Sequence, residues 1–336
     1  MRLWFMNAEN DDRNKEIIHW ACEQLEFLGY TIKNSLPEKI LNTPWSYVIR
    51  FETTDGYIYL KHTPEQLGLE AAIIQLLRDQ FYASVPTVIA HNTGLNCFLM
   101  EDAGQPLRTI LKQQFNTELL CKAVEQFTSL QLATADHTDV FLDIGVPDWR
   151  LDKLPDLYKE LFLQQDLLIE DGLSEIEISE LTALFPKVSH LCKTLSDYSI
   201  KQTIVQPDFN DNNTLIDDVS QAITTIDLGE IAISHPFFSL LNCLQQIKKH
   251  YGFTEKDSTY LQVLDACLKN YMSFHSKQHL IDAFRLAEVV WPVYGMLAQH
   301  RLMVACGKEK IISFQPGRLG ASMKEFIVVC KTIDVS

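Results

Sequence analysis

Residues 203–230 read TIVQPDFNDNNTLIDDVSQAITTIDLGE, and the interpretation of the whole chain depends on this stretch. It places Asp208 and Asn213 in a polar loop after one apolar run, and Asp227 at the end of a second apolar run. Metal-dependent phosphoryl transfer needs such a set, because one carboxylate deprotonates the attacking hydroxyl while an amide oxygen and a second carboxylate hold Mg²⁺ on the phosphates. The alternative is a polar turn between two strands, which Asn and Asp favour for backbone reasons alone.

The spacing Asp-x4-Asn followed by IDLG resembles the catalytic loop and metal-binding segment of the aminoglycoside phosphotransferase and choline kinase family. That family is a branch of the protein-kinase-like fold. The resemblance implies that Asp208 is the catalytic base and that Asn213 and Asp227 are the magnesium ligands.

The upstream half of the chain carries further stations of the same pattern. Asp55-Gly56 between two alternating runs predicts a hairpin that ends at Lys61, and residues 67–81 follow as a helix with Glu70 in its first turn. The resemblance implies that Lys61 holds the α- and β-phosphates and that Glu70 fixes this lysine by an ion pair. The alternative is a surface lysine beside a glutamate that the helix dipole favours.

The segment FLMEDAG, residues 98–104, resembles the hinge between the lobes in the same family, where adenine bonds main-chain groups. By that match Met100 lies at the back of the nucleotide pocket, and the main chain of Glu101 and Ala103 meets the base. A methionine on a strand is otherwise an ordinary core residue.

Hydrophobic periodicity predicts an α+β protein with two lobes. The small N-terminal lobe with its hinge, residues 1–104, has an antiparallel sheet preceded by a helix over 12–30. The larger lobe, residues 105–336, is mostly helical and holds the catalytic loop and the acceptor site. The helices expected in it span 114–133, 154–168, 176–195, 237–251, 259–275, 278–300 with a bend at Pro292, and 321–332.

Composition excludes several classes of function. The chain has 336 residues, a net charge of −15 and no apolar run near the roughly 20 residues that span a bilayer. An acidic surface repels nucleic acid and anionic membranes, so we expect neither as a partner. The eight cysteines form no Cys-x-x-Cys pair, which favours a reducing cytoplasm, and a monomer or a dimer is expected. No P-loop, dinucleotide fingerprint or G-x-S-x-G elbow is present.

Three departures from the family pattern bear on activity. Gln206 stands where the family has a histidine, Ser239 stands where it has an aspartate, and the loop LNTPWSYV before the hairpin has no glycine. Phosphate contacts there would rest on Thr43, Ser46 and main-chain groups. These residues belong to the scaffold, so the reacting set itself is intact.

The sequence therefore predicts an ATP- or GTP-dependent, Mg²⁺-dependent phosphotransferase that acts on a hydroxyl of a small molecule. A pseudokinase that binds nucleotide or a partner without turnover is the alternative, and a metabolic kinase of homoserine, choline or fructosamine type differs only in the pocket. Residues 136–180 hold thirteen acidic side chains against three basic ones. That balance favours a cationic or polyhydroxylated acceptor such as an aminoglycoside, amino sugar or amino alcohol, unless these acids only solvate the surface.

Overall fold

The computed structural model of the chain describes residues 2–34 and 36–332. The N-terminal part is built on a five-stranded antiparallel sheet with the order β1-β2-β3-β5-β4. Its strands are β1 (Glu38–Asn42), β2 (Tyr47–Thr53), β3 (Gly56–His62), β4 (Val88–Asn92) and β5 (Cys97–Glu101). The predicted hairpin is confirmed, since β2 and β3 pair over seven residues and Gly56 takes a positive φ at their turn.

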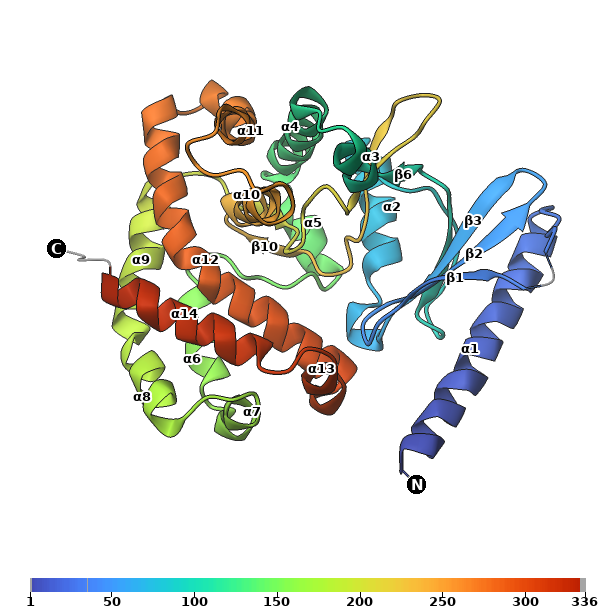
Figure 1. The fold of residues 1–336 in the computed structure, drawn as a ribbon, viewed down its shortest axis with the longest axis horizontal. Helices are drawn as coiled ribbons and strands as arrows, with labels where there is room; N and C mark the ends of the chain where they lie inside the picture. Colours follow the sequence, from blue (N-terminus) through green and yellow to red (C-terminus); the bar gives the residue numbers. More distant parts are fainter. Residues whose placement is uncertain (1, 35, 333–336) are drawn as a thin grey trace.

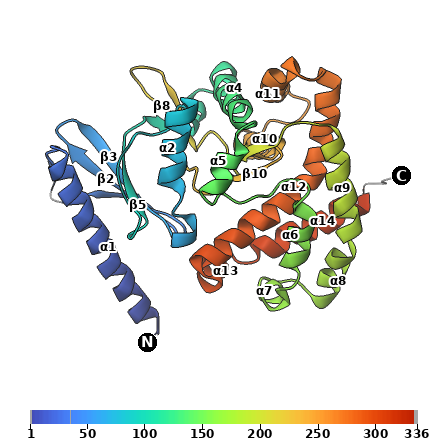
Figure 2. The ribbon, with the colours of Figure 1, turned by 180° about the vertical axis from the view of Figure 1, so that it is seen from behind.

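Two helices cover the two faces of this sheet. Helix α1 (Arg2–Phe27) packs Ile17, Ala21 and Leu25 on one face, and α2 (Glu70–Phe81) packs on the other. Figures 1 and 2 both place α1 on the outer side and α2 between the sheet and the rest of the molecule. The chain leaves this lobe after β5, and the predicted boundary at residue 104 falls between β5 and β6 (Gln105–Pro106).

The second part is mostly helical, which confirms the predicted α+β class with a small sheet followed by helices (Figure 1). Its helices are α3 (Leu107–Gln113), α4 (Thr117–Thr134), α5 (Thr138–Asp143), α6 (Leu154–Leu161), α7 (Gln165–Glu170), α8 (Glu175–Ala183), α9 (Phe185–Asp197), α10 (Phe237–Tyr251), α11 (Ser258–Lys269), α12 (Lys277–Cys306), α13 (Lys308–Phe314) and α14 (Arg318–Thr332). Short strands β7 (Thr203–Val205), β8 (Thr214–Ile216), β9 (Ile223–Thr225) and β10 (Ala232–Ser234) carry the functional loops.

Several helix boundaries differ from the expectation. The segment 154–168 forms two helices, α6 and α7. The segment 176–195 also forms two, α8 and α9, because Pro186 lies in the first turn of α9 and favours the start of a new helix there. Pro292 lies inside a continuous α12, and α13 was not predicted. None of the helices in the part of the chain that the structure describes is long and apolar enough to cross a membrane.

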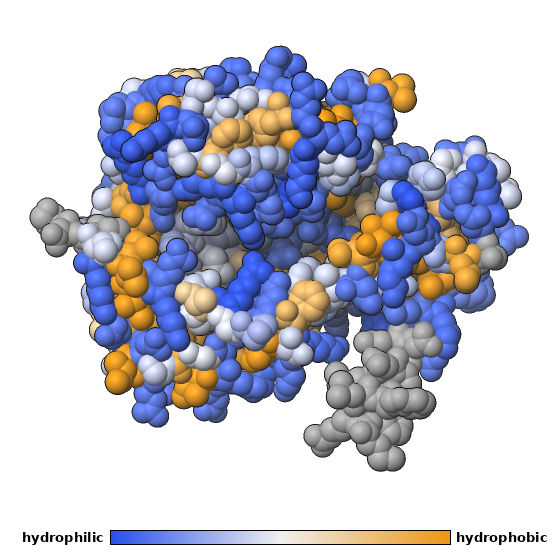
Figure 3. All heavy atoms as spheres, in the orientation of Figure 1, coloured by the Kyte–Doolittle hydropathy of each residue, from blue (hydrophilic) through white to orange (hydrophobic). Residues whose placement is uncertain are grey.

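Strands β6 to β10 form two small sheets. Strand β7 pairs with β10, and the hairpin of β8 and β9, which comes between them in the chain, pairs with β6. Gly104 makes this possible beside the hinge, because a Cβ there would lie 2.0 Å from the carbonyl oxygen of Ile216. Figure 3 shows a hollow in the middle of the helical part, with mostly hydrophilic residues around it.

Candidate active site

The alternation of side chains along β3 directs Lys61 into the site. Leu60 faces α1, so Lys61 faces α2 on the opposite side of the sheet. There its Nζ lies 2.9 Å from Oε1 and 2.7 Å from Oε2 of Glu70, the first residue of α2. The same Nζ lies 2.5 Å from Oδ1 of Asp227, which comes 166 residues later in the chain. Three residues that the sequence analysis selected are thus joined directly.

The charge of Lys61 follows from these contacts. Burial acts to lower its pKa, but the carboxylates of Asp227 and Glu70 outweigh burial and hold the pKa above its ordinary value. Lys61 is 5% exposed and Glu70 is 2% exposed. Breaking such a buried pair by removing one partner typically costs about 3–5 kcal/mol, so the pair holds β3, α2 and the Asp227 segment together.

Asp227 has an unusual backbone conformation. Its φ of 62° lies in the left-handed region, which costs an ordinary residue about 1–2 kcal/mol. Gln206 Nε2 donates to the carbonyl oxygens of Ile226, at 2.8 Å, and of Asp227, at 2.9 Å. The next main-chain N–H, of Leu228, donates to Glu70 Oε1 at 3.1 Å. Neighbouring side chains therefore hold the strained residue in place.

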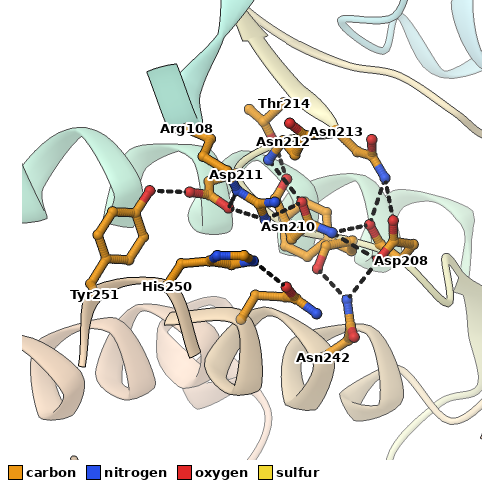
Figure 4. A network of polar contacts seen from close by, with 12 residues as sticks. Arg108, Asp208, Asn210, Asp211, Asn212, Asn213, Thr214, Asn242, His250 and Tyr251 are labelled. Carbon is orange, nitrogen blue, oxygen red and sulfur yellow. Dashed lines mark hydrogen bonds and ion pairs between the residues drawn. The ribbon is translucent and has the colours of Figure 1, made fainter. Parts of the chain in front are cut away.

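The loop after β7 holds Asp208 among amide groups (Figure 4). Asn213 Nδ2 donates to Asp208 Oδ2 at 2.9 Å and to its carbonyl oxygen at 2.8 Å. Asn210 Nδ2 donates to Oδ1 at 2.9 Å, and Asn242 Nδ2 lies 3.4 Å from the same oxygen. The main-chain N–H of Ile226 donates to the carbonyl of Asn213 at 3.0 Å, which ties this loop to the segment that carries Asp227.

The surroundings of Asp208 favour proton uptake. Its side chain reaches solvent, yet partial burial of the carboxyl group is the main cause that raises its pKa. The charge of Asp227 raises the pKa further, while hydrogen bonds from Asn213 and Asn242 oppose the change. A carboxylate with a raised pKa is the better general base.

A second layer of contacts fixes the loop from behind (Figure 4). Arg108 at the start of α3 donates to Asp211 Oδ1 from Nε, at 2.9 Å, and from Nη2, at 2.7 Å. It also donates to Asn210 Oδ1 at 3.0 Å, and the Tyr251 hydroxyl donates to Asp211 Oδ2. Because its oxygen accepts from Arg108, the Asn210 amide must turn its NH₂ group toward Asp208.

The sequence analysis did not identify these supporting residues. Asn210 and Asp211 lie within the selected loop, so their polar character was a usable signal. Arg108, Asn242 and Tyr251 come from helices far away in the chain, and no local pattern distinguishes them.

The oxygen donors present fit a magnesium ion on a phosphate chain. The carboxamide oxygen of Asn213 and the second carboxylate oxygen of Asp227 accept no hydrogen bond from any described residue. Both are hard oxygen ligands, and Mg²⁺ usually takes one or two protein ligands together with phosphates and waters. Within residues 2–34 and 36–332 no group of three or more His, Cys, Asp or Glu side chains is suited to a metal on its own.

Glu230 is a further acidic residue at the site that the sequence analysis missed. It lies three residues after Asp227, and burial, followed by the charge of Asp227, raises its pKa to about 8. Arg301 opposes this change and Asp208 adds to it. Its carboxylate accepts no hydrogen bond from the described part of the chain.

The two scaffold departures both make hydrogen bonds. Gln206 donates to the carbonyls of Ile226 and Asp227, as described above. Ser239 bonds both the main-chain N–H and the main-chain carbonyl of Gln206. Gln206 N donates to Ser239 Oγ at 2.8 Å, and Ser239 Oγ donates to Gln206 O at 2.9 Å. Ser239 and Gln206 are 0% and 1% exposed. The scaffold of the catalytic loop is therefore connected, although its residue types differ from those of the resembling family.

The glycine-free loop between β1 and β2 is held by its own residues. Ser46 N donates to Thr43 Oγ1 at 3.0 Å, and Thr43 N donates to the Ser46 carbonyl at 2.9 Å. The Ser46 hydroxyl is buried and has no partner among the described residues. The Trp45 ring meets Phe314 of α13 edge to face, with centroids 5.3 Å apart, so the loop reaches across to the helical lobe.

The hinge residues lie along β5 and just after it. Met100 is half-buried opposite Tyr59 of β3. Glu101 N donates to the Thr87 carbonyl at 3.0 Å, so this N–H is already used. The N–H of Ala103 donates to no described residue and is therefore the group that is open to a base.

Ion pairs with residues outside it offset part of the acidic stretch 136–180. Six of its acidic residues pair with basic side chains; the pairs are Asp136–Lys201, Asp148–Arg150, Asp152–Lys153, Glu170–Lys308, Glu177–Lys324 and Glu180–Lys331. Four of these partners lie outside the stretch. The count of charges along the sequence therefore overstates the field that an acceptor would meet.

No protein-family model and no curated protein matches the sequence. Solved structures do match it. An ethanolamine kinase from Plasmodium vivax superposes with a TM-score of 0.59 and 11% identity, over 88% of this chain and 82% of that one. The GDP complex of wild-type aminoglycoside 2'-phosphotransferase-IIIa gives a TM-score of 0.58 and 16% identity, over 93% and 98%.

Amicoumacin kinase hAmiN, solved in complex with AMP-PNP, Ca²⁺ and Ami, gives a TM-score of 0.58 and 15% identity, over 97% of this chain and 96% of that one. A macrolide 2'-phosphotransferase of type I also matches, with a TM-score of 0.56. At such low identity the likeness shows the fold. The chain therefore has the protein-kinase-like fold that these aminoglycoside and macrolide phosphotransferases and ethanolamine kinase share, as the catalytic-loop resemblance implied.

Proposed function

We propose that the protein is a nucleotide-dependent phosphotransferase that moves the γ-phosphate to a hydroxyl of a small molecule. One observation carries the proposal. Lys61, Glu70 and Asp227 meet through direct ion pairs, and Asn213 bonds the Asp208 carboxylate, although these residues are spread over 166 positions of the chain. A polar turn with no further role would not need this convergence.

In the proposed reaction Asp208 accepts the proton of the acceptor hydroxyl while that oxygen attacks the γ-phosphorus. The bond between the γ-phosphorus and the β–γ bridging oxygen breaks, and the nucleoside diphosphate leaves. Lys61 binds the α- and β-phosphates, and Glu70 keeps its ammonium in place. Asn210, oriented by Arg108, holds the carboxylate of Asp208 from the side.

Asn213 and Asp227 would hold Mg²⁺, which when bound neutralises charge on the phosphates. Met100, Glu101 and Ala103 would surround the base, with Ala103 as the main-chain donor. ATP and GTP both fit this description, so the assay must include both. All eight cysteines are free thiols, which supports a cytoplasmic setting for the proposed enzyme.

A transfer assay tests the proposal. Purified protein is incubated with γ-labelled ATP or GTP, Mg²⁺ and a panel of aminoglycosides, macrolides, amino alcohols and neutral sugars. We expect label on at least one acceptor, and loss of that transfer in Asp208→Asn. Nucleotide binding without transfer to any acceptor would favour the alternative, a protein that binds nucleotide without turnover. The loop between Thr43 and Ser46, which has no glycine, is the feature that favours this alternative.

For the acceptor we propose a molecule with an amine. Ion pairs with four residues outside stretch 136–180 offset part of its charge, so that stretch supports this class less strongly. The support comes from Glu230, whose carboxylate lies near Asp227 and Asp208 without a partner of its own. An ammonium group would favour the ionised form of Glu230 and offset the charges of Asp227 and Asp208, whereas a carboxylate or phosphate would hold Glu230 protonated and add to those charges.

Glu230→Gln tests the acceptor class. We expect it to raise KM for an amine-bearing acceptor clearly and to leave KM for a neutral analogue unchanged. Glu288→Gln is the control, because Glu288 is an exposed glutamate whose charged neighbours are Lys248 and Glu255 and not the acidic residues of the site. An equal response of both acceptors to Glu230→Gln would rule out a direct contact with the ammonium.

A further inference from the structure

The main chain that follows the metal residue is held by side chains from three separate parts of the fold. Gln206 bonds the carbonyls at its start, and Glu70 bonds the N–H of Leu228. Arg301 of α12 bonds the carbonyls at its end. Asp227 lies between these attachments, and its left-handed conformation depends on them.

Arg301 makes an unusual set of contacts. Its Nη1 donates to the carbonyl oxygen of Glu230 at 3.0 Å and to that of Ile231 at 3.1 Å, and its Nη2 donates to that of Gly229 at 3.3 Å. One guanidinium thus spans three consecutive carbonyl groups. Burial lowers the pKa of Arg301, yet arginine stays charged at any physiological pH.

These bonds go to main-chain oxygens and not to a carboxylate. Among the described residues no carboxylate forms an ion pair with Arg301, and the Glu230 side chain meets it only through longer-range attraction. The contacts therefore do not depend on which side chains the segment carries. They set the path of the backbone, which is what determines where the carboxylate of Asp227 lies.

Helix α12 also touches the catalytic loop. Tyr294 donates its hydroxyl to the carbonyl oxygen of Val205 at 3.2 Å, directly before Gln206. Residues seven apart lie on the same face of a helix, so Tyr294 and Arg301 face the site together. A single rigid helix thus attaches to the strand before the base and to the segment after the metal ligand.

We propose that Arg301 is a positioning residue that holds the Asp227 segment in the conformation that can receive a metal ion. This inference rests on the proposed function, because it needs Asp227 to bind metal beside a nucleotide. The alternative is that Arg301 only stabilises the fold. A positioning role predicts that replacing Arg301 weakens nucleotide binding with Mg²⁺ more than nucleotide binding without it. A purely stabilising role predicts equal losses.

Arg301→Met and Arg301→Lys are the variants to compare. Methionine keeps the apolar length but has no donor, and lysine keeps the charge but cannot span three carbonyls as a planar fork does. Arg285→Met is the matched control, since Arg285 lies on the same helix with 75% of its side chain exposed. The affinity of each protein for AMP-PNP and GMP-PNP is measured by calorimetry with Mg²⁺ and again with EDTA, beside its melting temperature.

We expect Arg301→Met to weaken Mg²⁺-dependent nucleotide binding about tenfold or more, the range seen when an outer partner of a metal ligand is removed. The dissociation constant measured in EDTA should change less than about twofold, which corresponds to about 0.4 kcal/mol of binding free energy. Arg301→Lys should fall between Met and the parent, and Arg285→Met should match the parent.

Equal losses with and without Mg²⁺ in Arg301→Met, or a variant that only melts earlier, would overturn the inference and leave the proposed function intact. A parent protein that binds nucleotide equally with Mg²⁺ and EDTA would overturn both. If Arg301→Met does not fold, Arg301→Lys decides by the same ratio of affinities.

Discussion

Replacing Gln206 by leucine removes the side chain that connects the catalytic loop to the metal segment. The substitution keeps most of the volume but deletes the amide that donates to the carbonyls of Ile226 and Asp227, at 2.8 and 2.9 Å. Gln206 is 1% exposed, so water has little access to replace these bonds. Both carbonyls are then left without their side-chain donor.

The expected cost follows from the two orphaned groups. Leaving a buried polar group unpaired costs about 1–3 kcal/mol, so Gln206→Leu should destabilise the protein by roughly 2–5 kcal/mol. With a urea m value of about 3 kcal/mol/M, a loss of about 3 kcal/mol moves the unfolding midpoint by about 1 M. Urea titration followed by tryptophan fluorescence measures this shift.

Gln131→Leu provides a matched control for the site. Gln131 is 0% exposed, and its Nε2 also donates to two main-chain carbonyls, those of Ile204 and Pro236, at 3.0 and 3.1 Å. Gln131→Leu should lose at least as much stability, because its Oε1 also accepts from the Tyr271 hydroxyl at 3.0 Å, whereas Gln206 Oε1 has no partner among the described residues. Only Gln206→Leu should weaken Mg²⁺-dependent nucleotide binding, because only Gln206 holds the backbone of Asp227. If both variants, or neither, lost metal-dependent binding, the connection from Gln206 to the metal site would be refuted.

Three further predictions test the reacting groups. Asp208→Asn should lower kcat of transfer by about 10²- to 10⁴-fold and leave nucleotide affinity nearly unchanged, and unaltered turnover in a verified variant would exclude Asp208 as the base. Asp227→Ala should abolish the Mg²⁺ dependence of nucleotide binding in calorimetry, because one of few direct oxygen ligands is lost. Glu230 has a folded-state pKa raised to about 8 from 4.5, so the folded state keeps a proton that the unfolded state releases, and stability should fall as pH rises through this window. Glu230→Gln should flatten that fall in melting curves between pH 5 and 8.5, and an unchanged slope would contradict the raised pKa.

Local patterns were sufficient for the elements that have short-range causes. The turn at Asp55-Gly56 required a positive φ between two alternating runs, so the hairpin that ends near Lys61 followed from the sequence. The loop from Asp208 to Asn213 was selected by its polar residues between two apolar runs, by the IDLG that follows and by the resemblance of the whole order of residues to the family pattern. These features depend on neighbours within a few residues.

The rest of the site depends on contacts between distant segments. Arg108 bonds Asp211 across 103 positions, and Arg301 bonds Glu230 across 71, and neither arginine differs in local context from a surface residue. The charge of stretch 136–180 was misjudged for the same reason, because partners such as Lys308 and Lys331 come from helices at the end of the chain. Sequence spacing does not contain these pairings.

The residues that depart from the resembling family have one property in common, which is that they are neutral. Ser239 accepts from the N–H of Gln206 and donates to its carbonyl, so one hydroxyl satisfies both groups without burying a charge. His235, fully buried before α10, has a pKa lowered by burial to about 3 and is neutral at any pH at which the protein would be assayed. A scaffold of Gln206, Ser239 and His235 therefore does not titrate between pH 5 and 9. The carboxyls with raised pKa values at the site are Asp208, Glu230 and Glu70, so the pH profile of transfer should report on these groups. The part of the profile that is lost in Glu230→Gln then belongs to Glu230.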